Sequence, residues 1–264
     1  MDKITTIVRK EWTEVFKNKL VLFTVVLLPL LLLVLPLGTL VFMERAAVTM
    51  PESFNDQEIQ QFAGSMCVGL TTADCTILYT LQLFVLMLMI LPVAIPVTIA
   101  AYSIVGEKTS RTLEPLLATP ITTAELLIAK SIAAVVPAVA ATWVAYLVFV
   151  AGVRILGSPM VFERFTQPYW LLAIFVLAPL LSLLSVAAAV MISSRTSDPR
   201  VAEQISAVVM LPVILLVLGQ SVGLILIDQR VIVLMIVVIG LLDIVLLSVA
   251  VRLFRRETIL TRWK

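Results

Sequence analysis

Six apolar runs, each long enough to cross a membrane, dominate the pattern of hydrophobic and polar positions along the chain. A membrane-spanning helix needs about 20 mostly apolar residues. The runs are continuous and do not alternate with polar residues, which favours helices over strands. They are Leu20–Met43, Ile77–Val105, Ser131–Val153, Tyr169–Ser193, Gln204–Ile227 and Val231–Val251. The pattern predicts an all-α integral membrane protein with six spans, forming a single transmembrane domain over residues 1–264.

Residues 1–19, ahead of the first run, follow a different pattern. Apolar side chains fall on one helical face and most charged side chains lie elsewhere, which indicates an amphipathic helix in the cytoplasmic interface that turns into the first span near Asn18. A short solvated helix end is the alternative, and Trp12 among the apolar positions favours the interface. These positions are Ile4, Ile7, Val8, Trp12, Val15 and Phe16. The charged segment and the length of the run favour a retained span over a signal peptide.

The positive charges give the orientation of the spans. Lysine and arginine are enriched on the cytoplasmic side of membrane proteins. Fifteen of the 19, Lys130 included, lie in the two termini and in the second and fourth loops. The other four are Arg45, Arg154, Arg164 and Arg230. Both termini are therefore predicted to be cytoplasmic, in agreement with an even number of spans.

Composition supports this picture and excludes several functions. The chain is 61% hydrophobic and 14% charged, whereas a soluble domain carries about 25% charged residues, so the lipid bilayer is its predicted surroundings. The net charge is +2, and the basic residues stand at the ends of apolar runs, which does not fit a nucleic-acid partner. There is no histidine, the commonest general base and metal ligand. We therefore expect no catalytic residues and no metal site.

The first external loop, residues 44–76, holds both cysteines of the chain, Cys67 and Cys75. An extracytoplasmic location permits a disulfide between them. Two free thiols are the alternative, and the sequence leaves the choice open.

Polar groups that could carry chemistry are few. Gly106-Glu107-Lys108-Thr109 ends like a phosphate-binding Walker A loop, but Ala101 stands where that loop needs its first glycine, so no nucleotide site is predicted. Asp243 lies near the middle of the sixth span, where a charge costs about 2.5–3.5 kcal/mol. It could contact an ion or a substrate, but the lack of a charged partner favours a structural hydrogen bond to a neighbouring helix.

The second cytoplasmic loop, residues 106–130, is the most informative segment. Thr112–Ala118 can form a short helix with three leucines on one side, and Pro120 is expected to end it. Thr122-x-x-Glu125 resembles a capping box that opens the third span. A short helix that lies parallel to the membrane and exposes leucines favours a docked partner over a solvated loop.

This loop, read as GEK-x-x-x-TLE-x-LL-x-TP, resembles the membrane subunits of type-2 ABC transporters, most of all the sodium-export and drug-export branch. IVRKEWTEVFKNK at the N-terminus, Ser194-Arg195 to Asp198-Pro199 and the tail Leu253–Glu257 also fit that family. The resemblance covers essentially the whole chain. One departure is the short connection between spans five and six, which leaves no room for the re-entrant external element of some relatives unless the fifth run is broken.

The resemblance implies a permease subunit of an ATP-driven exporter in the plasma membrane, which binds no cofactor itself. Two permeases, the same chain twice or two similar chains, would work by alternating access with two cytosolic ATPase subunits that bind ATP and Mg²⁺. Residues 106–130 would be the coupling segment that contacts the ATPase. Its implied contact residues are Gly106, Glu107, Arg111, Thr112, Leu113, Glu114, Leu116, Leu117 and Pro120.

The resemblance further implies a pathway at the interface between the two permeases, near spans one, two and five. Candidate pathway residues are Thr98, Tyr102, Gln220, Ser221 and Asp243. The alternative is a secondary transporter or channel that is driven by an ion gradient and uses Asp243, and a membrane enzyme is the least favoured interpretation. The sequence leaves the substrate open between a lipophilic drug, a lipid, a peptide and a cation.

Overall fold

The computed structural model describes residues 2–49, 67, 69–109, 122–193, 196, 198–224 and 227–253. Within these residues every regular element is a helix. Six stretches are long and apolar enough to cross a membrane, and each coincides with one predicted run; the ends differ by at most seven residues (131 predicted, 124 observed). They are Val21–Ala47, Thr72–Gly106, Ala124–Leu156, Pro168–Ser193, Arg200–Ser221 and Gln229–Ala250. The predicted fold is therefore confirmed.

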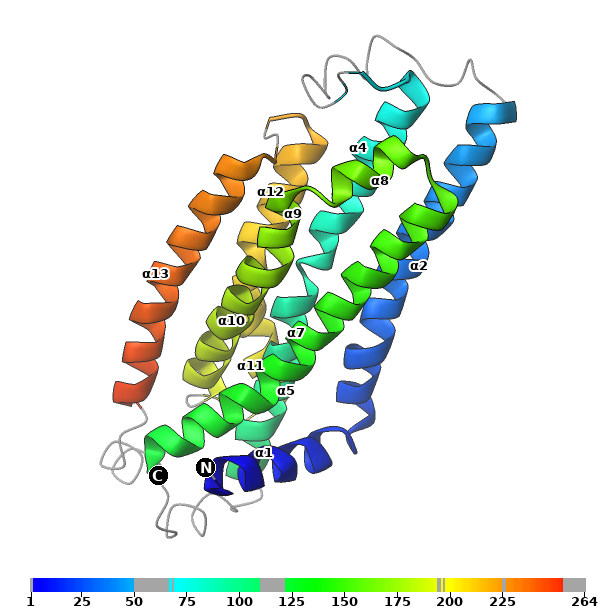
Figure 1. Ribbon diagram of the computed structural model, residues 1–264. Helices are drawn as coiled ribbons and strands as arrows, with labels where there is room; N and C mark the ends of the chain where they lie inside the picture. Colours follow the sequence, from blue (N-terminus) through cyan, green and yellow to red (C-terminus); the bar gives the residue numbers. More distant parts are fainter. Residues whose placement is uncertain are drawn as a thin grey trace.

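The six spans are built from helices that run side by side in one bundle (Figure 1). Spans one and three are the continuous helices α2 (Lys19–Thr49) and α7 (Thr123–Leu156), and span six is α13 (Gln229–Leu253). Span two consists of α4 (Thr72–Leu88) and α5 (Leu91–Thr109). Span four consists of α9 (Pro168–Leu172), η3 (Ala173–Leu177) and α10 (Ala178–Ser193). Span five consists of α11 (Pro199–Ser206), η4 (Ala207–Met210) and α12 (Leu211–Ser221).

Span two forms the centre of the bundle. Every residue from 91 to 101 is buried, as expected for a helix that is apolar on all sides. The helix α5 packs against α7 and α10, while α4 contacts α2 and α12. The helices α2 and α13 lie at opposite edges of the bundle and expose most of their apolar side chains (Figure 1). Spans one, five and six thus leave the most surface for lipid or for a partner.

Proline divides two of the spans. The turn at Met89 and Ile90 separates α4 from α5, and Pro96 inside α5 has no amide hydrogen for the carbonyl of Pro92. The hydroxyl of Ser185 on α10 lies 3.4 Å from that carbonyl oxygen. In span five, the 3₁₀ turn η4 precedes Pro212 in the first turn of α12. Within the described residues, the fifth run is therefore broken by a change of helix type.

Span four contains one π-helical turn, η3. A π-helical turn shifts the backbone hydrogen bonds of a helix and can leave a carbonyl oxygen without its usual partner. A hydrogen-bond donor on a neighbouring helix often takes that place. Here the indole of Trp143 on α7 donates a hydrogen bond of 3.0 Å to the carbonyl oxygen of Ile174, and its ring lies 5.2 Å from that of Phe175. The contact fixes span four against span three.

The N-terminal helix α1 (Asp2–Val15) lies across one end of the bundle, in a direction different from that of the spans (Figure 1). The chain leaves α1 at residues 16–18, where the turn near Asn18 was predicted. The end of α13 lies at this same end, while Arg45, Arg154, Arg164 and Arg230 stand near helix ends on the opposite side. The basic residues that the structure describes thus follow the two ends of the bundle as predicted, and the cytoplasmic assignment of the α1 end stays a prediction.

The third span begins at a capping residue and ends at a glycine. The hydroxyl of Thr122 accepts a hydrogen bond from the backbone of Glu125, and the Glu125 carboxylate accepts one from the backbone of Thr122. This arrangement is the predicted capping box. At the other end Gly157 terminates α7, and a short helix, α8 (Pro159–Phe165), follows it.

Candidate functional site

The proposed coupling segment is described only at its two ends. Gly106 and the backbone of Glu107 belong to the last turn and a half of α5, and a Cβ added at Gly106 would meet no atom within 4 Å. The description resumes at Thr122, where α7 is capped. The predicted helix Thr112–Ala118 and the other predicted contact residues lie outside the described residues. They are Arg111, Thr112, Leu113, Glu114, Leu116, Leu117 and Pro120, and their roles stay predictions.

A buried charged network joins the two described ends of this segment to α1. The ammonium group of Lys130 on α7 donates to the Glu11 carboxylate on α1 and to the hydroxyl of Ser103 on α5, both at 2.7 Å. The Ser103 hydroxyl donates to the other Glu11 oxygen at 2.6 Å. Glu11 is 3% exposed and Lys130 is 6% exposed. Three helices therefore meet at one closed set of hydrogen bonds.

Apolar and indole contacts extend this junction along α1. Ile7 and Val8 pack against Leu126, Ala129 and Ala133 in the first turns of α7. The Trp12 indole donates a hydrogen bond of 2.9 Å to the carbonyl oxygen of Ala133. The apolar face of α1, predicted to lie in the membrane interface, is thus largely covered by the chain itself.

The sequence pattern did not predict this network. The sequence pattern places Lys130 at the end of a loop, whereas it lies buried about two turns into α7. Glu11 carried a usable signal, because it stands within the apolar positions of α1, four residues after Ile7 and four before Val15. A charge on the apolar face of an amphipathic helix requires a buried partner, and nothing local in the sequence identifies that partner as Lys130.

The network makes the stability of the α1 contact depend on pH. Burial by itself raises the pKa of the Glu11 carboxyl, but the Lys130 ammonium and the hydrogen bonds from Lys130 and Ser103 outweigh it, with a smaller contribution from Lys10. The pKa therefore lies below its ordinary value of 4.5. A lowered carboxyl pKa gives stability that is present above the unfolded pKa and is lost as the pH falls through the folded pKa.

We therefore expect the native protein to be more heat-stable than Glu11→Gln at neutral pH, with a gap that closes as the pH falls below about 4.5. The measurement is the melting temperature of both proteins in nanodiscs across the acid range. Lys17→Met serves as a control, because it removes an exposed positive charge in the turn after α1. A gap between native protein and Glu11→Gln that does not change with pH would contradict the network.

The predicted pathway residues do not form one site. On the central helix α5, Thr98 is 3% exposed and donates at 2.6 Å to the carboxylate of Glu203 on α11, while Tyr102 is half-buried. Gln220 is completely buried and Ser221 is exposed, both at the other end of span five. Since a helix rises about 1.5 Å per residue, Glu203 and Gln220 are about 25 Å apart along that span. Glu203 is a polar contact that the sequence analysis did not identify.

Gln220 lies in a polar layer between α12 and α4. The hydroxyl of Tyr79 on α4 donates a hydrogen bond of 2.7 Å to the carbonyl oxygen of Gln220. The same carbonyl accepts from the backbone of Gly223, at φ +74°, in the turn that ends α12. The amide group of the Gln220 side chain and the amide nitrogen of buried Gln82 have no hydrogen-bond partner among the described residues. Burying amide groups in this way costs about 1–3 kcal/mol.

Gln220→Leu is accordingly expected to raise the free energy of unfolding by about 1 kcal/mol, because it removes two unpaired polar atoms and keeps a side chain of similar volume. Denaturation by SDS titration in mixed micelles measures the change. Gln204→Leu makes the same substitution at an exposed position of the same span, and its effect is expected to stay within about 0.5 kcal/mol. A loss of stability in Gln220→Leu alone would show that the amide has a partner.

Asp243 is separate from both groups. It stands on the inner face of α13 in line with Ile232 and Ile239, is 4% exposed, and neither of its carboxyl oxygens has a hydrogen-bond partner among the described residues. The expected hydrogen bond to a neighbouring helix is thus absent from the described part of the chain. No group of three or more His, Cys, Asp or Glu residues that could hold a metal occurs there either. The role of Asp243 stays a prediction.

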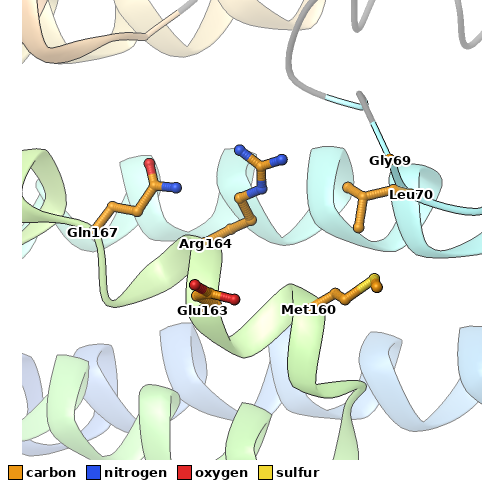
Figure 2. A pocket seen from close by; sticks show the side chains of 6 residues that line it. All are labelled: Gly69, Leu70, Met160, Glu163, Arg164 and Gln167. Carbon is orange, nitrogen blue, oxygen red and sulfur yellow. The ribbon is translucent and has the colours of Figure 1, made fainter.

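The end of the bundle away from α1 carries the disulfide and a polar hollow. Cys67 and Cys75 are joined in the structure, with Cα atoms 5.3 Å apart. Beside them a hollow of about 310 Å³ lies between Gly69 and Leu70 and the helix α8, lined by Glu163, Arg164 and other side chains (Figure 2). Its polar groups stand at the surface and include no buried polar residue. A second hollow of similar volume, between α7, α10 and α13, is almost entirely apolar.

Comparison with known proteins gives one family. The family model described as ABC-2 family transporter protein matches residues 5–232 of this chain. The match begins in α1, takes in spans one to five with the charged network and the loop of residues 106–130, and ends in the first turn of α13. No curated protein matches the chain.

Proposed function

The chain belongs to the ABC-2 family of transporter proteins, and we propose that, as the permease subunit of such a transporter, it exports its substrate by alternating access. The energy would come from ATP hydrolysed by separate cytosolic ATPase subunits. The match of the family over 228 of 264 residues carries the assignment as permease. The sodium-export and drug-export branch suggested by the loop motif is part of the proposal.

The lack of a nucleotide-binding motif in this chain supports an ATPase that is a separate subunit. The sequence of residues 1–264 contains no Walker A loop, because Ala101 replaces the first glycine of the partial match at residues 106–109. Those residues also continue the helix α5 and are not the loop between a strand and a helix that phosphate binding needs. The permease is a transmembrane component without an ATPase motif, and ATP with Mg²⁺ would be bound by its partner.

We propose residues 106–130 as the contact with that partner. They connect the central helix α5 to the long helix α7, so a force on the segment would act directly on the core of the bundle. Rigid helices packed in two alternative arrangements are the usual basis of alternating access. The cytoplasmic side of the membrane follows from the excess of lysine and arginine at this end of the chain.

A second permease is part of this proposal, and the exposed faces limit where it can bind. Span two is the most enclosed of the six spans in this chain, so the expected interface near spans one, two and five would be formed mainly by its neighbours. The helices α2 and α12 both pack on α4 and expose apolar side chains on either side of it. We propose the permease interface and the substrate pathway on this side, with α13 facing lipid.

Co-purification tests the proposal. The tagged chain, expressed with its genomic neighbours and extracted gently, is expected to bring down an ATPase subunit in equal amount. Glu107→Ala combined with Leu116→Asp is expected to abolish this binding and ATP-dependent transport while membrane insertion continues. The control combines Glu163→Ala with Leu224→Asp, the same two changes at exposed positions of the opposite end. A native chain without any ATPase would overturn the proposal.

A further inference from the structure

We infer that α1 is a lever that carries a displacement of the inner ends of α5 and α7 to α2, with Glu11, Ser103 and Lys130 as its joint. The inference rests on the proposed function in one respect: the displacement would come from the segment joining α5 to α7, which is the proposed ATPase contact. The lever itself is argued from the described residues and concerns how α1 and α2 move together.

The joint connects both helices that flank this segment. Ser103 stands three residues before Gly106 on α5, and Lys130 stands eight residues after Thr122 on α7. Because Glu11 bonds to both, α1 cannot stay in place if either end moves without breaking a buried charge-assisted hydrogen bond. Such bonds are about twice as strong as neutral ones, and a buried charge left unpaired is costly. The network therefore favours a movement in which α1, α5 and α7 shift together over one in which α1 separates from the other two.

The arm of the lever is stiff on the side of α7. Over two turns of α1, Ile7, Val8 and the indole of Trp12 engage the first turns of α7. With an ion pair at its centre and packing on both sides of it, α1 is held at several points along its length. A helix held in this way can transmit rotation as well as translation.

The other end of α1 leads directly into span one. The connection is only residues 16–18, and backbone hydrogen bonds of 3.1 Å (Phe16 to Trp12) and 3.0 Å (Asn18 to Val15) order it. Val15 before the turn and Val21 after it are both buried in the main core. A movement of α1 therefore reaches α2 without a flexible linker.

The span that receives the movement is mostly exposed on the outside of the bundle. Most of α2 faces outward, with side chains such as Phe23 (62% exposed) and Phe42 (73% exposed) outside the bundle. It approaches α7 closely at Gly152, where an added Cβ would lie 2.4 Å from a methyl group of Leu37. Sliding at such a close contact changes the outer surface of the permease without opening its core.

Spin labels test the lever in the full chain, reconstituted in nanodiscs. Labels are placed at two pairs of exposed positions: Thr13 with Ile155 reports α1 against α7, and Phe42 with Ile155 reports α2 against α7. The two native cysteines are joined to each other and are not labelled. In Lys130→Met, the widths of both distance distributions are expected to at least double. In Lys10→Met, which breaks the exposed pair with Glu14, both widths are expected to stay at their native values.

Two further variants keep the result decisive. Glu11→Leu with Ser103→Ala and Lys130→Met leaves no buried charge and is expected to narrow both distributions again. Ser103→Ala alone removes two hydrogen bonds and no charge, so it is used if Lys130→Met does not insert. If Lys130→Met widened the distance distribution between α1 and α7 but left that between α2 and α7 unchanged, the inference that α1 moves α2 would be wrong. Adding ATP and vanadate to the complex then tests the proposed function separately: no shift in native protein would count against that function, while the result on the joint stands.

Discussion

Lys130→Met is expected to lower the free energy of unfolding by about 3–5 kcal/mol, the largest effect of any single substitution considered for this chain. Methionine fills the space of the lysine stem but leaves the Glu11 carboxylate buried without its cation. Attraction to lysine offsets the desolvation of this carboxylate in the native protein, and that desolvation remains when the lysine is gone. SDS titration in mixed micelles, followed by tryptophan fluorescence, measures the difference.

The surface pair and a repaired variant provide the controls for this prediction. Lys10→Met is expected to cost at most about 1 kcal/mol, because the Lys10 and Glu14 side chains are 39% and 56% exposed and 3.8 Å apart. Glu11→Leu and Ser103→Ala, added to Lys130→Met, are expected to recover most of the loss, since apolar replacement of a complete buried ion pair is often neutral or stabilising. An equal loss for Lys10→Met and Lys130→Met would show that the buried network contributes little.

Phe165→Ala is expected to cost about 3 kcal/mol. Phe165 ends α8 and is completely buried, with its ring 5.2 Å from Phe149, edge to face, and 6.2 Å from Trp170. Its carbonyl oxygen accepts a hydrogen bond from the hydroxyl of Tyr146. Truncation leaves a cavity between the end of α7 and the start of span four, which loosens the link between them.

Phe42→Ala is the matched control for this second prediction, because it removes the same ring from a side chain that is 73% exposed on α2. Its effect is expected to stay within about 0.5 kcal/mol. The loss of native, monodisperse protein on heating gives a second readout of both variants. If Phe165→Ala melted at the same temperature as Phe42→Ala, the aromatic cluster around α8 would not contribute to stability.

The sequence predicted those parts of the fold that depend on neighbouring residues. Continuous apolar runs are read within one helix, so the six spans were placed with small errors at their ends. The capping box at Thr122 is local for the same reason, since its two partners are three residues apart. The break in span five was raised only as a condition, because Pro212 is tolerated in the first turn of a helix and gives no sign of the 3₁₀ turn before it.

The contacts between distant residues could not be predicted. Glu11 and Lys130 are separated by 119 positions, and Thr98 and Glu203 by 105. Such pairs depend on which helices become neighbours, and hydrophobicity does not determine this in a bundle where most faces are apolar. The same limit applies to the pathway residues: Gln220 and Thr98 are both polar within apolar spans, yet they lie near opposite ends of the bundle.

The long separation between Glu11 and Lys130 has a consequence for the order of events during synthesis. A chain that grows at about 5–20 residues per second needs about 6–24 seconds to add 119 residues. During that interval α1 has left the ribosome, while the helix that will cover it has not yet been made. The apolar face of α1 then has only the lipid surface to rest on, and α7 takes its place when the third span inserts. The apolar face of α1 thus binds the membrane surface during synthesis and packs against α7 in the folded protein.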